Sequence, residues 1–182
     1  KYSNMVFYHK KKIFIPLTIH IEIKKVYKSF QNKILMSKKI EKLYYTLIND
    51  FKITKPKMIL AGINPHAGEN QTISKDDNKY LLPIINLLKK RGLFIDGPVS
   101  GDGMINNQNL NYYDAFIFTY HDQALIPFKI LSNYQGVNFT SNLDIIRVSP
   151  SHGTAENLIG SKKVISNGII NCFNLIKKIN RN

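Results

Sequence analysis

Residues 115–123, AFIFTYHDQ, are the stretch from which the fold and function of this chain are best inferred. The first five are apolar or β-branched, a pattern typical of a buried strand. His121 and Asp122 follow directly, so they fall where a strand ends and a helix begins, the edge at which open α/β sheets bind ligands. The basic and amide side chains that come next complete a set suited to a divalent metal and an anionic substrate: Lys129, Asn138 and Arg147.

Apolar runs of strand length alternate with helical patterns along the chain. Such alternation predicts an α/β fold in which crossover helices connect the strands of one sheet. Ser37 is the expected N-cap of one helix, and Gly92 the expected stop of another. The expected strands are residues 13–19, 57–63, 115–119, 136–140 and 145–148, and the expected helices are residues 37–51, 80–88 and 164–179. Residues 96–111, rich in Gly, Asn and Asp, are expected to form a long loop, either functional or disordered.

The charge balance raises the question of a nucleic-acid partner. The 26 Lys and Arg residues against 12 Asp and Glu give a formal net charge of +14, and basic chains attract phosphate-bearing partners. Only three of the basic residues are arginine, however, whereas recognition of bases and phosphates favours arginine. The lysines are scattered along helix faces, which favours a solvated surface over a nucleic-acid-binding face.

Other features of the composition exclude several classes of protein. The single cysteine, Cys172, rules out an intramolecular disulfide and a cysteine-based zinc site, and its apolar helical setting predicts a core residue. No apolar run approaches the roughly 20 residues that cross a bilayer, and the start has no signal-peptide layout, so we expect a cytoplasmic protein. Because the chain starts at Lys1 rather than at a methionine, we also expect a fragment.

Four of the five histidines lie at expected junctions between strands, loops and helices. Any one of them alone is best interpreted as a structural histidine that forms a hydrogen bond. For three together we favour a metal site, since neutral imidazoles suit zinc, cobalt and similar ions and no thiolate cluster competes. The predicted ligands are His20, His66 and His121, which lie too far apart in the sequence to form a local metal motif.

Six segments, in order, resemble the C-terminal half of the 4-hydroxythreonine-4-phosphate dehydrogenase family, which acts in pyridoxal phosphate biosynthesis. They are AGINPHAGE (61–69), GPVSGD (97–102), YDAFIFTYHDQALIPFK (113–129), GVNFT (136–140), IIRVS (145–149) and HGTAENLIG (152–160). The resemblance implies an isocitrate/isopropylmalate dehydrogenase-like fold with the N-terminal domain largely missing. Residues 1–160 would form the metal- and cofactor-binding domain, and residues 161–182 a helix that packs on the missing domain.

The resemblance also assigns roles to individual residues. His20, His66 and His121 match the family's ligands for a divalent metal (zinc, cobalt or magnesium), at an active site on a homodimer interface. The substrate-binding residues would be Lys129, Asn138 and Arg147. Asp102 and Asp122 are the candidates for proton transfer or for support of the metal ligands. The residues that contact NAD or NADP would be His152, Gly153, Thr154 and Ala155. The apolar neighbours of Arg147 would bury it, which favours a substrate contact over a surface ion pair.

The implied reaction is the NAD(P)-linked oxidation and decarboxylation of 4-phosphohydroxy-L-threonine to 3-amino-2-oxopropyl phosphate. A metal suits this chemistry because it stabilises the alkoxide and then the enolate as a Lewis acid. Two alternatives remain open from the sequence. One is a paralogue that acts on erythronate or threonate 4-phosphate, and the other is a catalytically inactive basic fragment that binds metal or nucleic acid.

Overall fold

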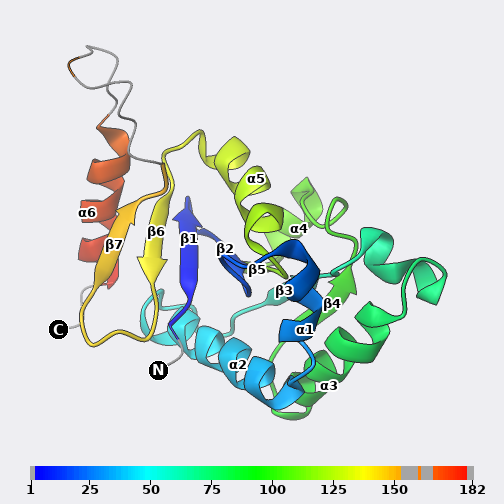
Figure 1. Ribbon diagram of the computed structural model, residues 1–182. Coiled ribbons are helices and arrows are strands. Elements are labelled where there is room, and N and C mark those ends of the chain that lie inside the picture. Colours follow the sequence, from blue (N-terminus) through cyan, green and yellow to red (C-terminus); the bar gives the residue numbers. More distant parts are fainter. Residues whose placement is uncertain (1–2, 153–159, 161–165, 180–182) are drawn as a thin grey trace.

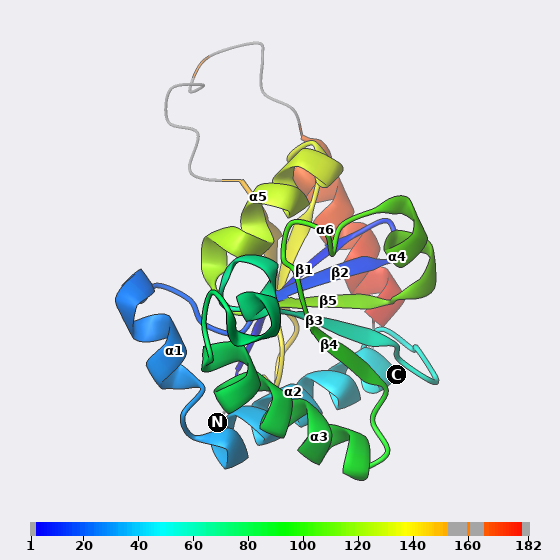
Figure 2. The ribbon, with the colours of Figure 1, turned by 90° about the vertical axis from the view of Figure 1, so that its right-hand side faces the viewer.

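The computed structural model describes residues 3–152, 160 and 166–179, in which a single sheet is covered by helices on both faces (Figures 1 and 2). The strand order is β4-β3-β5-β2-β1-β6-β7. Four neighbouring strands are parallel: β2 (Lys12–Pro16), β3 (Met58–Ala61), β4 (Ile95–Val99) and β5 (Ala115–Phe118). Three antiparallel strands extend the sheet beyond β2: β1 (Met5–His9), β6 (Val137–Thr140) and β7 (Arg147–Pro150).

The helices and short helical turns connect these strands. The helices are α1 (Val26–Ser29), α2 (Lys33–Asn49), α3 (Leu82–Lys90), α4 (Asn107–Tyr112), α5 (His121–Ser132) and α6 (Asn167–Ile179). Three further helical turns are η1 (Ile23–Lys25), η2 (Pro65–Gln71) and η3 (Asp77–Leu81), the last of which runs directly into α3. None of the helices in the described part of the chain is long and apolar enough to cross a membrane.

The central strand β5 explains why the chain forms two layers of core. Ala115 and Ile117 belong to a cluster that includes the buried sides of α2 and α3, whereas Phe116 and Phe118 pack with Phe128 of α5 on the opposite face. All four β5 residues are buried, as expected of a parallel strand covered on both faces. The continuous apolar run therefore forms the predicted strand, and it delivers His121 to the first residue of α5.

Most expected elements are present, with shorter or shifted bounds. Gly92 follows the end of α3 with a φ of 82°, as predicted for a helix stop. The Ser37 prediction is wrong, because α2 begins one turn earlier and Asn32 is its N-cap, with the side chain accepting from the Leu35 backbone at 3.0 Å. The expectation of one long loop over residues 96–111 is also wrong, since this segment contains most of β4 and most of α4.

Helix α6 packs its buried side on β6 and β7 (Figure 1). Cys172 is buried there, as predicted, together with Leu175 and Ile179. The opposite side carries Ile169 and Phe173, which are 54% and 61% exposed. The assignment of residues 161–182 to a separate packing unit stays a prediction, and residues 161–165 lie outside the described part of the chain.

Candidate active site

Three parallel strands end at one edge of the sheet, and each is followed by a histidine. The β2 and β5 pairing continues past the strands, because the Leu17 amide donates to the Phe118 carbonyl at 2.8 Å and the Thr18 amide to the Thr119 carbonyl at 3.2 Å. His20 follows β2, His66 follows β3 and His121 follows β5. The parallel register therefore brings residues that are distant in the sequence to the same edge.

Gln123 ties two of these strand ends together. Its Oε1 accepts from the Thr119 amide at 2.9 Å and from the Thr119 hydroxyl at 2.8 Å, while its Nε2 donates to the Gly62 carbonyl at 2.9 Å. A Cβ on Gly101 would lie 2.8 Å from the same Nε2, so the loop after β4 approaches this junction closely. The ends of β5, β3 and β4 are thus held as one unit below the histidines.

His20 and His121 meet at this edge. Their ring centroids lie 5.5 Å apart, with the rings tilted by 48°. Two imidazoles on one tetrahedral ion, with metal–nitrogen bonds near 2.0–2.1 Å, would place their centroids about 5 Å apart. Nδ1 of His121 lies 2.7 Å from Oδ1 of Asp122, an arrangement that orients the ring and leaves Nε2 as the free nitrogen.

His66 lies in a backbone turn of unusual hand. Every residue of 66–71 has a positive φ, between 44° and 80°, and only Gly68 among them is glycine. A left-handed turn costs about 1 kcal/mol or more per non-glycine residue. Strain of this kind persists only where the surroundings impose it, and it clusters at functional sites.

Two adjoining cavities connect the histidines. One of about 210 Å³ is lined by His20 and His121, and one of about 460 Å³ by His66 and Asp102; Tyr120 and Asp122 line both. The pKa of Asp102 lies below its usual range, mainly because the Ser100 hydroxyl donates to it, with backbone amides adding to the effect. Asp102 is therefore an ionised carboxylate beside His66.

The three predicted metal ligands are not all within reach of one ion. His20 and His121 form a close pair, whereas His66 lines the neighbouring cavity. Within residues 3–152, 160 and 166–179, no three His, Cys, Asp or Glu side chains are close enough to bind one ion. A single chain in this conformation thus supplies a pair of imidazole ligands that Asp122 supports.

The three predicted substrate residues lie outside both cavities. Lys129 is two turns along α5 from His121, with its Nζ 5.9 Å from the centroid of the Tyr134 ring. Asn138 is in β6, and its buried side-chain oxygen has no hydrogen-bond partner among the residues that the structure describes. The expectation that apolar neighbours bury Arg147 is wrong, because this residue is exposed at the start of β7, where its guanidinium donates to the Thr140 hydroxyl at 2.8 Å.

The predicted cofactor contacts are only partly placed. His152 is exposed, just after β7, and a Cβ on Gly168 of α6 would lie 3.2 Å from its Nε2. The other predicted contacts, Gly153, Thr154 and Ala155, lie outside the described residues.

Two groups next to the site escaped the sequence reasoning. Lys39 reaches from α2 to the end of β2, where its ammonium donates to the Leu17 carbonyl at 2.6 Å and burial lowers its pKa. Asp77 is fully buried beneath the His66 turn. Both lie in charged runs that look like solvated surface, so the sequence carries no signal that would have singled them out.

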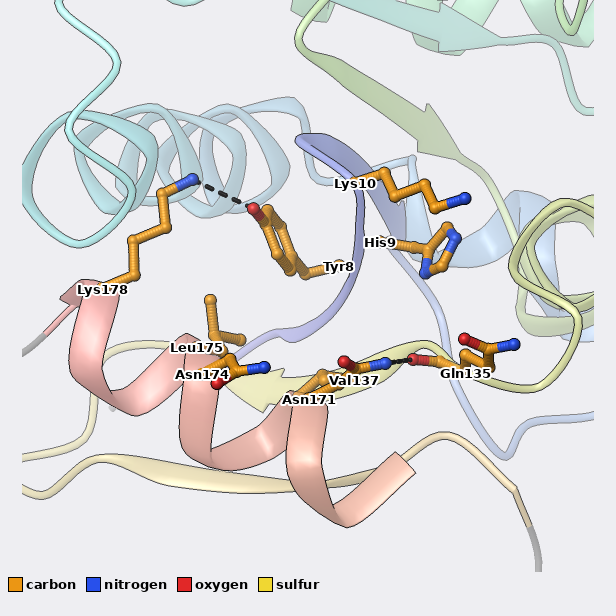
Figure 3. Close-up of a pocket in the computed structure, with 9 residues that line it drawn as sticks. All are labelled: Tyr8, His9, Lys10, Gln135, Val137, Asn171, Asn174, Leu175 and Lys178. Carbon is orange, nitrogen blue, oxygen red and sulfur yellow. Dashed lines mark hydrogen bonds between the residues drawn. The ribbon is translucent and has the colours of Figure 1, made fainter. Parts of the chain in front are cut away.

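A further cavity of about 250 Å³ lies away from the histidines, between α6 and the β1–β2 hairpin (Figure 3). Its polar lining consists of Tyr8, His9, Lys10, Gln135, Asn171, Asn174 and Lys178. Several of these groups are paired with each other. The Lys178 ammonium donates to the Tyr8 hydroxyl at 3.0 Å, and the Asn171 amide donates to the Gln135 carbonyl at 2.8 Å.

Comparison with known protein families shows to which family the chain belongs. Residues 1–176 match the family described as pyridoxal phosphate biosynthetic protein PdxA. The chain belongs to this family. The match covers all three histidines as well as the Gln123 junction and the left-handed turn.

Individual relatives give the same result. The chain is 39% identical over 149 residues to 4-hydroxythreonine-4-phosphate dehydrogenase of Zymomonas mobilis, covering 82% of this chain and 44% of the relative. It is 36% identical over 146 residues to the enzyme of that name from Paracoccus denitrificans, covering 80% and 45%. A crystal structure of 4-hydroxythreonine-4-phosphate dehydrogenase from Klebsiella pneumoniae superposes with a TM-score of 0.83 at 30% identity, covering 98% of this chain and 54% of that one. The chain thus spans about half the length of these relatives.

Proposed function

We propose that this chain is the metal- and cofactor-binding part of a 4-hydroxythreonine-4-phosphate dehydrogenase with an isocitrate/isopropylmalate dehydrogenase-like fold. The reaction would be the NAD(P)-linked oxidation and decarboxylation of 4-phosphohydroxy-L-threonine to 3-amino-2-oxopropyl phosphate, in the cytoplasm. The observation that carries the proposal is the His20–His121 pair, 5.5 Å between ring centroids, at the sheet edge of a PdxA-family chain. Family membership supports the substrate class, and the paired imidazoles support a divalent ion.

His20 and His121 would hold the ion, with His66 facing it across the adjoining cavity. A divalent metal bound there would supply Lewis-acid stabilisation of the negative charge that develops on the substrate oxygen. Asp122 keeps the His121 ring in place through the 2.7 Å contact to Nδ1. Removal of such a supporting carboxylate typically weakens metal affinity by about 10- to 100-fold.

Asp102 suits a charge-holding role better than that of a general base. Its lowered pKa keeps it ionised at neutral pH but also makes it a weak proton acceptor. We therefore assign Asp102 to the support of a cationic or hydroxyl group in the larger cavity. Asp122, whose carboxylate lines both cavities, is the better placed of the two for proton transfer.

The anionic groups of the substrate have several candidate partners. Tyr120 gives α5 no side-chain cap, so the first-turn amides of this helix are open to an anion beside His121. Lys129 and Arg147 would add positive charge, and the buried, unpaired oxygen of Asn138 would accept from a substrate hydroxyl or ammonium group. His152 and the segment that follows would contact the nicotinamide cofactor.

A homodimer with the active site at its interface is part of the proposal. Large apolar side chains that line the two cavities at the histidine edge are exposed, with Ile23 at 65% and Ile126 at 62% exposure. Exposed apolar groups that flank a site commonly mark a contact surface. A second copy placed against them would exclude water and bring further ligands toward the His20–His121 pair.

The test is the natural full-length protein assayed for NADH or NADPH formation with 4-phosphohydroxy-L-threonine. We expect activity to be lost with a chelator and to fall by roughly 100-fold or more in His121→Ala. The matched control is His9→Ala, which removes a histidine from the α6 cavity and should leave the rate unchanged. Activity that survives both the chelator and His121→Ala would refute the proposal. Faster turnover of erythronate or threonate 4-phosphate would identify a paralogue instead.

A further inference from the structure

We infer that Asp77 is a positioning residue, which holds the left-handed turn of residues 66–71 in the conformation that presents His66. This inference rests on the proposed function, in which His66 faces the metal. Asp77 lines neither of the two cavities at the histidine edge. It acts from the opposite side of the turn, in the first turn of the helix formed by η3 and α3.

The carboxylate of Asp77 is fully buried and accepts from both residues that lead into the turn. The Ile63 amide donates to Oδ1 at 2.7 Å, and the Asn64 side-chain amide donates to Oδ2 at 2.9 Å. Among the described residues no cation forms an ion pair with it. Its charge is balanced instead by these two donors and by the positive end of the helix in which it lies.

Two nearby glycines show that the backbone packs closely against this carboxylate. A Cβ on Gly62 would lie 2.7 Å from Asp77 Oδ1 and 2.7 Å from the Ala67 Cα. A Cβ on Gly68 would lie 3.3 Å from Asp77 Oδ2 and 2.4 Å from the Ser74 carbonyl oxygen. The side chain thus fills the space between the end of β3 and the turn, which leaves the turn no room to relax inward.

The turn needs such an anchor at its start because most of its backbone hydrogen bonds lie at its end. The Ala67 amide donates to the Asn64 carbonyl at 3.1 Å at the start of the turn. At its end, the Thr72 amide donates to the Glu69 carbonyl at 3.0 Å, and the amides of Ile73 and Ser74 donate to the Gly68 carbonyl at 3.2 and 3.4 Å. His66 and Glu69 are exposed, so their side chains contribute little packing. Without the carboxylate, the strained residues would return to ordinary conformations, and the His66 ring would leave the cavity that it shares with Asp102.

The experiment compares cobalt affinity in the full-length protein and three variants, measured by titration of the cobalt absorption bands. Asp77→Ala leaves both donors unpaired and should weaken cobalt binding by about 10- to 100-fold. Asp77→Asn should weaken cobalt binding far less. Its remaining oxygen still accepts from the Ile63 amide, and the Asn64 side-chain amide can rotate so that its oxygen accepts from the new NH₂. The control is Asp50→Ala, which removes another buried carboxylate, at the end of α2, and should leave the cobalt affinity unchanged.

Hydrogen exchange of the amides of residues 63–71 separates failure of this inference from failure of the proposed function. Asp77→Ala should speed exchange in this segment, and Asp50→Ala should not. If the wild-type protein binds no cobalt, the proposed function fails, and the exchange rates alone decide the role of Asp77. Unchanged exchange in Asp77→Ala, or cobalt binding as tight as in the wild type, would overturn the inference.

Discussion

The histidine edge and the α6 cavity both gather histidine, tyrosine and charged side chains, but they differ in what those side chains bond to. In the α6 cavity several polar groups bond to each other, as in the Lys178–Tyr8 and Asn171–Gln135 contacts (Figure 3). At the histidine edge, His20 and His121 face one another, and Asp77 and Gln123 each bond to backbone that supports the site, Asp77 to the Ile63 amide and Gln123 to the Gly62 carbonyl. A polar cavity is a candidate active site when its chemical groups remain available and the backbone beneath them is fixed.

The histidine edge and the α6 cavity also differ in the strain of the backbone beside them. The hairpin beside the α6 cavity turns through Lys10 and Lys11, with φ values of 45° and 68°, as a two-residue turn between antiparallel strands requires. The His66 turn keeps positive φ over six residues, which no connection between a strand and a helix requires. The first kind of strain belongs to the geometry of the fold, and the second belongs to the site.

The largest expected effect comes from crowding the His66 turn. Gly68→Ala should lower the free energy of unfolding by about 3 kcal/mol, since it adds a Cβ at positive φ only 2.4 Å from the Ser74 carbonyl. The control is Gly92→Ala, at the similar φ of 82° but with nothing within 4 Å of the new Cβ, where the expected loss is about 1 kcal/mol. Urea unfolding of both variants measures the difference. Equal losses would mean that the turn relaxes freely and does not need its tight packing.

A smaller effect is expected from the paired groups of the α6 cavity. Tyr8→Phe removes the acceptor of the Lys178 ammonium, which lies at the surface. The free energy of unfolding should change by less than about 1 kcal/mol, because an exposed hydrogen bond is replaced by one to water. Cobalt affinity should not change at all. A drop in cobalt affinity would show that the two regions are coupled and would weaken the contrast between them.

The smallest expected effect is the change in stability with pH that His9 contributes. Burial lowers the pKa of His9 below 6.5, and the charge of Lys10 lowers it further. Because the unfolded chain binds the proton more readily, this histidine supports stability above about pH 6.5, and that support is lost as the pH falls toward the lowered folded pKa. Lys10→Ala should raise the pKa of His9 toward 6.5 and so reduce the stability that is lost as the pH falls. NMR titration of the ring measures the shift, and an unchanged pKa would show that Lys10 has no influence.

The sequence predicted the elements whose signals are local. The run AFIFT forms β5 because four buried apolar residues suit a strand covered on both faces. The first residues look like the inside of a sheet, but β1 was given no bounds, since its hairpin turn contains two lysines and none of the residues that usually mark such turns. β4 and α4 were mistaken for a loop because glycine, asparagine and aspartate are common in both settings.

The candidate site was predicted in its residues but not in its arrangement. Metal ligation by His20, His66 and His121 stays a prediction, and the structure pairs only the first and third. The left-handed turn was not foreseen, because His66, Ala67 and Glu69 carry no preference for positive φ. Asp77 gave no signal either, since a carboxylate between Asp76 and Asn78 looks like exposed surface.

The amino-acid sequence by itself determined the apolar strands, the amphipathic helices and the family to which the chain belongs, because each depends on residue type and order within a short window. The tertiary structure alone decided which residues meet. Parallel pairing of β2, β5 and β3 brings the segments after these strands to one edge, and burial of Asp77 holds one of those segments in a strained form. Such contacts join residues far apart along the chain, so they arise only once the sheet has formed.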